Sequence, residues 1–175
     1  PLEADGKMTV FVSILPQAYF LERIGGQHVD VVVFVDEGQS PERYEPSPKQ
    51  MAKLASAKAF FAIGVPFEKN VLKKIGRTNR NLVIVETQKG VVYRHLEGHD
   101  HGHDGKKGGE QESRISDPHI WMDPKLVKIQ ARNIHDALCS LDRANAQEYS
   151  RNLDAFLGDL DRVDLELAKI EEKVT

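Results

Sequence analysis

One short segment of the chain combines residue types that bind transition metals. Residues 117–124 read Asp-Pro-His-Ile-Trp-Met-Asp-Pro, so His119 stands between two prolines and two aspartates. A neutral imidazole in such a rigid frame is a good zinc ligand, and the alternative is a buried structural histidine. Asp117 or Asp123 could orient the ring by accepting a hydrogen bond from its second nitrogen; Asp123 could instead cap the helix that follows. The segment predicts a metal ligand at His119.

A second group of histidines lies just before this segment. Residues 98–112 contain glycine, charged residues and histidine but no large apolar side chain, so we expect a mobile surface loop at about 95–115. Histidines on such a loop form a flexible collector of zinc with little geometric selectivity. The loop histidines are His95, His99, His101 and His103. They predict an auxiliary metal site, and the alternative is a polar insert without a role.

The composition narrows the class of protein. The chain has 175 residues, of which 40% are hydrophobic and 29% charged, which suits one or at most two globular units. The formal net charge is -3, and acidic and basic residues are interspersed, so the sequence predicts no basic surface for binding nucleic acid. No apolar run approaches the roughly 20 residues that span a bilayer, and no signal sequence opens the chain, although a mature form would lack one. Cys139 is the only cysteine, which excludes an internal disulfide.

Strand and helix patterns alternate through the first half of the chain. Residues 29–35 are almost wholly apolar and β-branched, which is typical of a strand buried on both faces and so of a parallel sheet. Strands are expected at 8–14, 29–35, 59–63 and 82–85, and helices at 17–24, 47–57 and 66–75. This order predicts a doubly wound α/β lobe whose ligand crevice lies beyond the carboxyl ends of the strands.

Helical patterns fill the end of the chain. One helix is expected from Pro124, and a second, at 144–173, carries apolar residues at steps of three and four. At roughly 1.5 Å per residue the second helix would be about 45 Å long, so part of its apolar stripe lacks a partner within a small lobe. A helix that connects to another domain and a dimer helix would both fit. The absence of strict heptads favours the connecting helix.

The chain lacks the signatures of common enzymes. It contains no G-x-S-x-G, no P-loop and no G-x-G-x-x-G, and only His119 is firmly placed as a zinc ligand, whereas a hydrolytic zinc site needs three clustered ligands. His28 and His135 lie in apolar, periodic contexts and are interpreted as surface or boundary residues, not as ligands. We therefore expect a binding protein and not an enzyme.

Four separated motifs together resemble the zinc and manganese solute-binding proteins of bacterial ABC importers. They are Ser-Ile-Leu-Pro-Gln-Ala-Tyr-Phe at 13–20 with Ile-Gly-Gly at 24–26, Ser-Pro-Glu-Arg-Tyr-Glu-Pro-Ser-Pro at 40–48, Ile63-Gly64 with Glu68, and the 117–124 segment. The resemblance covers essentially the whole chain. It implies an N-terminal α/β lobe at 1–141 followed by a long connecting helix at 142–175, with a second lobe outside these residues.

The resemblance also implies a metal site between two lobes, made of three histidines and a carboxylate or close variants of that set. His119 matches one histidine of the family, while Glu42 stands where the family has another. A carboxylate can ligate zinc, and its presence shifts preference toward harder ions such as manganese. Glu42 is thus either a ligand or a solvated loop residue.

By the same resemblance, the expected function is that of an extracytoplasmic receptor, in the periplasm or at the cell surface. It would capture a transition metal, Zn(II) first and Mn(II) as an alternative, and deliver it to the membrane permease of an ABC importer. A native membrane anchor would lie outside the chain. A receptor of the same fold that binds a non-metal solute is the other alternative.

Overall fold

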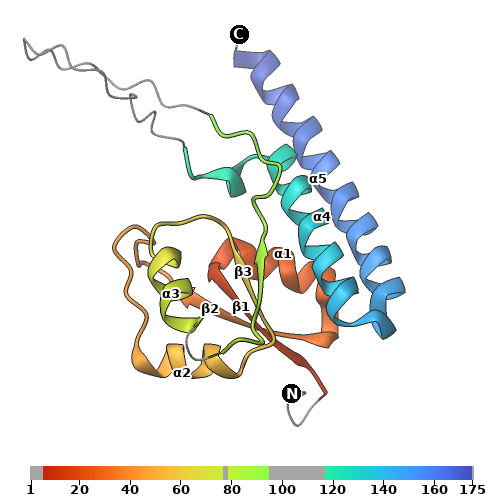
Figure 1. Ribbon diagram of the computed structural model, residues 1–175. Helices are drawn as coiled ribbons and strands as arrows, with labels where there is room; N and C mark the ends of the chain where they lie inside the picture. The colour runs from red at the N-terminus through yellow and green to blue at the C-terminus, as the bar shows by residue number, and fades with distance from the viewer. Residues whose placement is uncertain (1–5, 77–78, 95–116, 175) are drawn as a thin grey trace, which may run out of the picture.

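A parallel β-sheet forms the centre of the molecule, which is described by a computed structural model for residues 6–76, 79–94 and 117–174 (Figure 1). The four strands are β1 (Met8–Ile14), β2 (Val29–Val35), β3 (Ala59–Ala62) and β4 (Val83–Glu86). They lie in the order β2-β1-β3-β4, and each neighbouring pair is parallel. The predicted four-stranded parallel sheet is confirmed.

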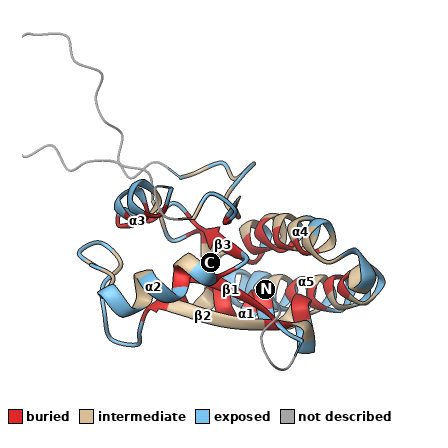
Figure 2. Cartoon of the chain, turned by 60° about the horizontal axis from the view of Figure 1, so that its bottom comes forward, coloured by how far each residue is buried: buried red, intermediate tan, exposed pale blue. Residues whose placement is uncertain are grey.

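Helices cover both faces of this sheet (Figure 2). The helices α1 (Leu15–Gly25), α4 (Pro124–Leu141) and α5 (Ala146–Val174) pack on one face, and α2 (Pro48–Ser56) and α3 (Glu68–Ile75) pack on the other. Two separate hydrophobic clusters result, one on each side of the sheet. The doubly wound α/β lobe expected from the sequence is therefore present.

The prediction for residues 29–35 needs a correction. We expected a strand buried on both faces, and β2 does contribute to both clusters, with Val31 and Val33 on one side and Val32 on the other. However, β2 is an edge strand, and residues 30–33 are only half buried. An apolar run indicates that helices cover both faces of a strand, but it does not indicate how many strands lie beside it. The sequence therefore did not distinguish an edge strand from a central one.

Two buried polar side chains fasten the carboxyl ends of the central strands. Gln17 accepts a hydrogen bond from the backbone N–H of Ser13 at 3.0 Å and donates to the carbonyl of Phe61 at 3.1 Å. The carboxyl group of Glu68 accepts from the Ser13 hydroxyl at 2.5 Å, from the N–H of Ile63 at 2.9 Å and from the N–H of Gly64 at 2.8 Å. Strands β1 and β3 are thus joined at their carboxyl ends, and ligands of such sheets bind beyond these ends.

The helices α4 and α5 form an antiparallel pair joined by a short turn, η3 (Arg143–Asn145). The first half of α5 buries its apolar residues against the lobe, with Tyr149 and Phe156 almost fully enclosed. Its second half extends past the sheet (Figure 1). The apolar residues exposed there are Val163, Leu165, Leu167 and Ile170. The long helix with a partly unpartnered stripe matches the sequence-based expectation. None of the described helices has the length and apolarity to cross a bilayer.

Candidate metal site

His119 lies at the start of a short 3₁₀ turn, η2 (Ile120–Met122), that leads into α4. The Nδ1 atom of its ring is 2.7 Å from Oδ1 of Asp117, and its backbone N–H donates to the same oxygen at 3.0 Å. The ring is tilted against Trp121, with centroids 5.1 Å apart. The side chain is 54% exposed, so it is not the buried structural histidine that formed the alternative interpretation.

Three anchors hold the backbone around His119. Ile120 is buried beside the sheet, and its carbonyl accepts a hydrogen bond at 3.1 Å from the fully buried Gln130 of α4. The N–H of Asp117 donates to the carbonyl of Arg94 at 2.9 Å, which ties the segment to the chain that follows β4. These contacts fix the position of the ring before any ligand arrives.

The Asp117 carboxylate also selects the state of the imidazole. Hydrogen bonds from the backbone and the ring of His119 lower the pKa of Asp117. The carboxylate therefore stays ionised well below neutral pH and accepts a proton from Nδ1–H. This arrangement leaves the lone pair of Nε2 free for a metal ion, which is the usual role of a carboxylate behind a metal-binding histidine.

Asp123 has the other role that the sequence allowed. Its Oδ1 accepts from the backbone N–H of Lys125 at 2.8 Å, so it caps the first turn of α4, and its Oδ2 lies 3.4 Å from the guanidinium of Arg94. Because Asp117 makes the contact to the ring, the structure assigns ring orientation to Asp117 and helix capping to Asp123.

A hollow of about 400 Å³ opens beside His119, between the start of α4 and the second half of α5. Its charged and polar lining includes Arg94, Asp117, His119, Asp123, Lys125 and Asp164. The Lys125 ammonium is 3.8 Å from a carboxylate oxygen of Asp164. The imidazole that could bind a metal is therefore reachable from solvent through a polar opening.

Glu42 lies on the segment that follows β2, and its side chain is exposed. Strand β2, which precedes the Glu42 segment, is at the opposite edge of the sheet from β4. The Glu42 segment is held against the start of α3, where Tyr44 packs edge-on against Phe67 at 5.1 Å between ring centroids. Within residues 6–76, 79–94 and 117–174, no three or more His, Cys, Asp or Glu side chains gather into a metal-binding group.

The loop histidines predicted as an auxiliary site, His95, His99, His101 and His103, lie outside the described residues. Gln130, in contrast, is a positioning residue that the sequence analysis missed. A signal was present: Gln130 is a polar residue on the apolar face of α4, four residues before the fully buried Ile134. A buried amide at such a position commonly satisfies a backbone group of a neighbouring segment.

Comparison with known proteins shows which family shares this sequence and fold. The family model described as "Zinc-uptake complex component A periplasmic" (ZnuA) matches residues 10–175. The chain belongs to this family. Its similarity to a crystal structure of ZnuA has a TM-score of 0.80 at 39% sequence identity and covers 94% of this chain and 58% of that one.

Two curated relatives show which ions ZnuA-family proteins are named for. The chain is 27% identical over 170 residues to the zinc-binding protein AdcA of Streptococcus pyogenes serotype M3, covering 92% of this chain and 33% of AdcA. It is 29% identical over 151 residues to the manganese ABC transporter substrate-binding lipoprotein PsaA of Streptococcus anginosus, covering 83% of this chain and 45% of PsaA.

The family description and these names are those of metal-uptake and ABC transporter substrate-binding proteins, which bind a solute and are not enzymes. The names of these two relatives include zinc in one case and manganese in the other, so the relatives are metal-binding proteins that differ in their ion. The chain spans less than two thirds of the length of each of these proteins.

Replacing Asp117 by asparagine tests the role of the carboxylate. Asparagine keeps an acceptor oxygen but has no negative charge, so it supports the Nδ1–H tautomer and the basicity of Nε2 less strongly. We expect Asp117→Asn in the natural full-length protein to weaken zinc binding by about 10–100-fold with little change in folding. Competition with a chelating dye measures the affinity, and Asp154→Asn, an exposed carboxylate on α5, is the control. Equal affinities for the two variants would contradict the assignment.

Proposed function

We propose that this chain is the N-terminal part of an extracytoplasmic receptor that captures Zn(II) and delivers it to the permease of an ABC importer. The observation that carries the proposal is His119, an exposed imidazole whose Nδ1 is held at 2.7 Å by the ionised Asp117. Such a ring is prepared to bind an ion without any chemical step. The zinc-binding relative AdcA and the periplasmic description of the family support the same function.

The proposal assigns His119 as one ligand and Glu42 as a second. The ZnuA crystal structure is longer than this chain, which covers 58% of it, and the ligands that complete the site would lie in a second lobe. In this arrangement residues 1–141 form the first lobe, and residues 142–175 connect it to the second. The exposed apolar residues in the second half of α5 support a role as a connecting helix, since the described residues of the lobe leave 43–63% of each of them exposed.

The loop histidines would act as an auxiliary collector. His95, His99, His101 and His103 precede the His119 segment in the sequence and would raise the local concentration of zinc. This part of the proposal rests on the composition of the loop. The receptor would work in the periplasm or at the cell surface, where a membrane anchor outside this chain could hold it.

Manganese is the second candidate because of Glu42. An oxygen ligand in place of an imidazole favours harder ions, and the relative PsaA is named for manganese. Zinc and manganese can be separated by experiment, because Glu42 would affect the two affinities differently if it is a ligand.

The test is a calorimetric titration of the natural full-length protein with Zn(II) and with Mn(II), in the presence of a competing chelator that keeps weak sites on the loop empty. We expect one ion bound tightly per protein, with zinc preferred. Absence of a tight site for either ion would overturn the proposal and favour a receptor of this fold for another solute.

A matched variant tests Glu42 as a ligand. Glu42→Ala removes a carboxylate from an exposed position with no buried contacts, so folding should be unaffected. We expect at least about a tenfold loss of affinity for the tightly bound ion, equivalent to roughly 1.4 kcal/mol. Glu45→Ala, three residues along the same exposed segment, is the control. Unchanged binding in Glu42→Ala would show that Glu42 is a solvated loop residue.

A further inference from the structure

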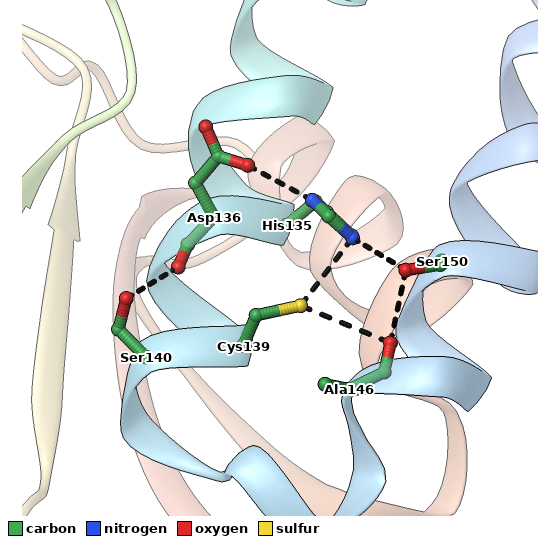
Figure 3. Close-up of polar contacts among 6 residues, drawn as sticks. All are labelled: His135, Asp136, Cys139, Ser140, Ala146 and Ser150. Atoms are coloured by element: carbon green, nitrogen blue, oxygen red, sulfur yellow. Dashed lines mark hydrogen bonds and ion pairs between the residues drawn. The ribbon is translucent and has the colours of Figure 1, made fainter.

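A second group of metal-binding atom types lies where α4 meets the start of α5, away from the hollow at His119 (Figure 3). The Sγ atom of Cys139 is 3.3 Å from Nε2 of His135, and the same nitrogen is 3.0 Å from the hydroxyl of Ser150. That hydroxyl is 3.0 Å from the carbonyl oxygen of Ala146, which in turn is 3.8 Å from Sγ. A thiol, an imidazole, a hydroxyl and a carbonyl thus form a closed ring of contacts.

The contact distances between neighbouring atoms of this group are close to the ligand–ligand distances around a tetrahedral zinc ion. With Zn–S at about 2.3 Å, Zn–N at about 2.05 Å and Zn–O at about 2.1 Å, tetrahedral angles place sulfur and nitrogen about 3.6 Å apart. The same geometry gives about 3.4 Å between nitrogen and oxygen and about 3.6 Å between sulfur and oxygen. The observed sulfur–nitrogen, nitrogen–oxygen and sulfur–oxygen contacts of 3.3, 3.0 and 3.8 Å lie within about 0.4 Å of these values, so small shifts would admit an ion.

The hydrogen atoms available cannot satisfy all four contacts at once. Nδ1 of His135 is 3.0 Å from the carboxylate of Asp136, which makes Nδ1 the protonated nitrogen and leaves Nε2 as an acceptor. Of the four atoms in contact, only the sulfur of Cys139 and the hydroxyl oxygen of Ser150 then carry a hydrogen, and each carries one. At any moment two of the four contacts bring lone pairs together. A cation at the centre would convert all four atoms into productive ligands.

The surroundings fit a metal site of modest strength. The Asp136 carboxylate plays the part behind His135 that Asp117 plays behind His119, fixing the ring through Nδ1. The His135 side chain is only 18% exposed, and Cys139 is partly buried. Burial, with a smaller contribution from the charge of Asp136, raises the pKa of the Cys139 thiol. The thiol is therefore a poor nucleophile, and its proton must leave when a metal binds.

We propose that His135 and Cys139, completed by the Ser150 hydroxyl and the Ala146 carbonyl, form a second site for a thiolate-binding divalent cation of the Zn(II) type. On binding, the S–H bond breaks, the proton passes to solvent, and a metal–sulfur bond forms. Because the ligand atoms come from both helices, the bound ion would hold α4 and α5 together next to the turn that joins them. The site is independent of the proposed transport function, and it revises the sequence-based interpretation of His135 as a surface or boundary residue.

Cobalt(II) is a direct probe, because a cobalt–thiolate bond gives a near-ultraviolet charge-transfer band that imidazole and carboxylate ligands do not give. Cys139 is the only cysteine among these 175 residues, so in this 175-residue chain any such band reports this site alone, whatever the other histidines bind. We expect a band that saturates as Co(II) is added and disappears when Zn(II) displaces it. Absence of the band at saturating Co(II) would overturn the proposal.

Four variants complete the test. Cys139→Ala should abolish the band, and His135→Ala should weaken Co(II) binding by at least about tenfold, or roughly 1.4 kcal/mol. Ser140→Ala is the matched control, because the Ser140 hydroxyl donates to the carbonyl of Asp136 and not into the ring (Figure 3). His119→Ala should leave the band unchanged, which separates this site from the proposed transport site. A band that survives His135→Ala at full affinity would contradict the ligand set.

Protection from alkylation gives a second readout. Saturating Zn(II) is expected to slow the reaction of Cys139 with iodoacetamide by at least about tenfold in the unchanged protein and in Ser140→Ala, and by much less in His135→Ala. Equal protection in all three proteins would show that zinc acts elsewhere, and no protection in any of them would show that the thiol is not a ligand.

Discussion

Replacing His119 by alanine in the natural full-length protein is expected to cause the largest loss of metal affinity of any single substitution in this lobe. Loss of a partner that only orients a ligand typically costs about 10–100-fold in metal affinity. Removing the imidazole itself removes a metal–ligand bond, so we expect a loss greater than about 100-fold. Competition with a zinc-chelating dye of known affinity measures the difference.

The local structure around His119 indicates that the substitution should change metal binding without changing the fold. His119 is half exposed, and the backbone around it is held by Ile120 and Gln130 and not by the ring, so alanine should leave the fold intact. His28→Gln is the control, since His28 lies elsewhere, with its Nε2 3.0 Å from a carboxylate oxygen of Glu148. If both variants bind zinc equally, the metal is not bound by the 117–124 segment.

The largest expected loss of stability comes from Glu68→Ala. The Glu68 side chain is 4% exposed and accepts hydrogen bonds from two backbone N–H groups, those of Ile63 and Gly64. Alanine would leave the N–H of Ile63 and the hydroxyl of Ser13 without this partner in a buried region, at about 1–3 kcal/mol for each donor. We therefore expect a decrease of about 2–5 kcal/mol in the free energy of unfolding. Urea denaturation followed by circular dichroism measures it, with the exposed Glu22→Ala as control.

Glu68 should also make stability depend on pH. Burial raises the pKa of this carboxyl group, although the hydrogen bonds from Ile63, Ser13 and Gly64 oppose the shift. The folded state therefore keeps the Glu68 proton to a higher pH than the unfolded chain does. The contribution of Glu68 to stability falls as the pH rises from the ordinary glutamate value, about 4.3, through the raised pKa of the folded protein, and stays low above it.

Glu68→Gln separates this effect from the loss of hydrogen bonds. The amide keeps one acceptor oxygen and cannot ionise, so the variant should lose the component of the pH dependence that belongs to Glu68. Unfolding at a series of pH values for the variant and the unchanged protein measures the difference. Identical pH profiles would mean that Glu68 titrates at the same pH in the folded and unfolded states.

The arrangement of strands and helices was largely determined by the sequence. Apolar β-branched runs, the Ser47-Pro48 start of α2 and the three-and-four spacing along α5 placed every strand and the long helix within a few residues. These signals are local, because they depend on which side chains one element must bury. The same locality explains the correction at β2, since being at the edge of a sheet depends on which strands are neighbours.

At the candidate metal site, too, the sequence determined one part and the tertiary structure decided another. The residue types around His119 identified it as a ligand candidate, yet the sequence allowed either aspartate to orient the ring. Only the folded chain decided that Asp117 contacts Nδ1 while Asp123 caps α4, because the turn at η2 directs one carboxylate toward the ring and the other toward the helix. The anchoring of this turn by Gln130 was likewise decided by tertiary packing.

The pair His135 and Cys139 shows most clearly what tertiary structure adds. Their spacing of four residues puts both on one face of α4, which the sequence determined by itself. What that face meets is decided by the antiparallel return of α5, which brings Ser150 and the Ala146 carbonyl to the same point. A helix fixes the neighbours of a residue along one chain segment, whereas a donor set that spans two helices exists only once the turn between them has formed.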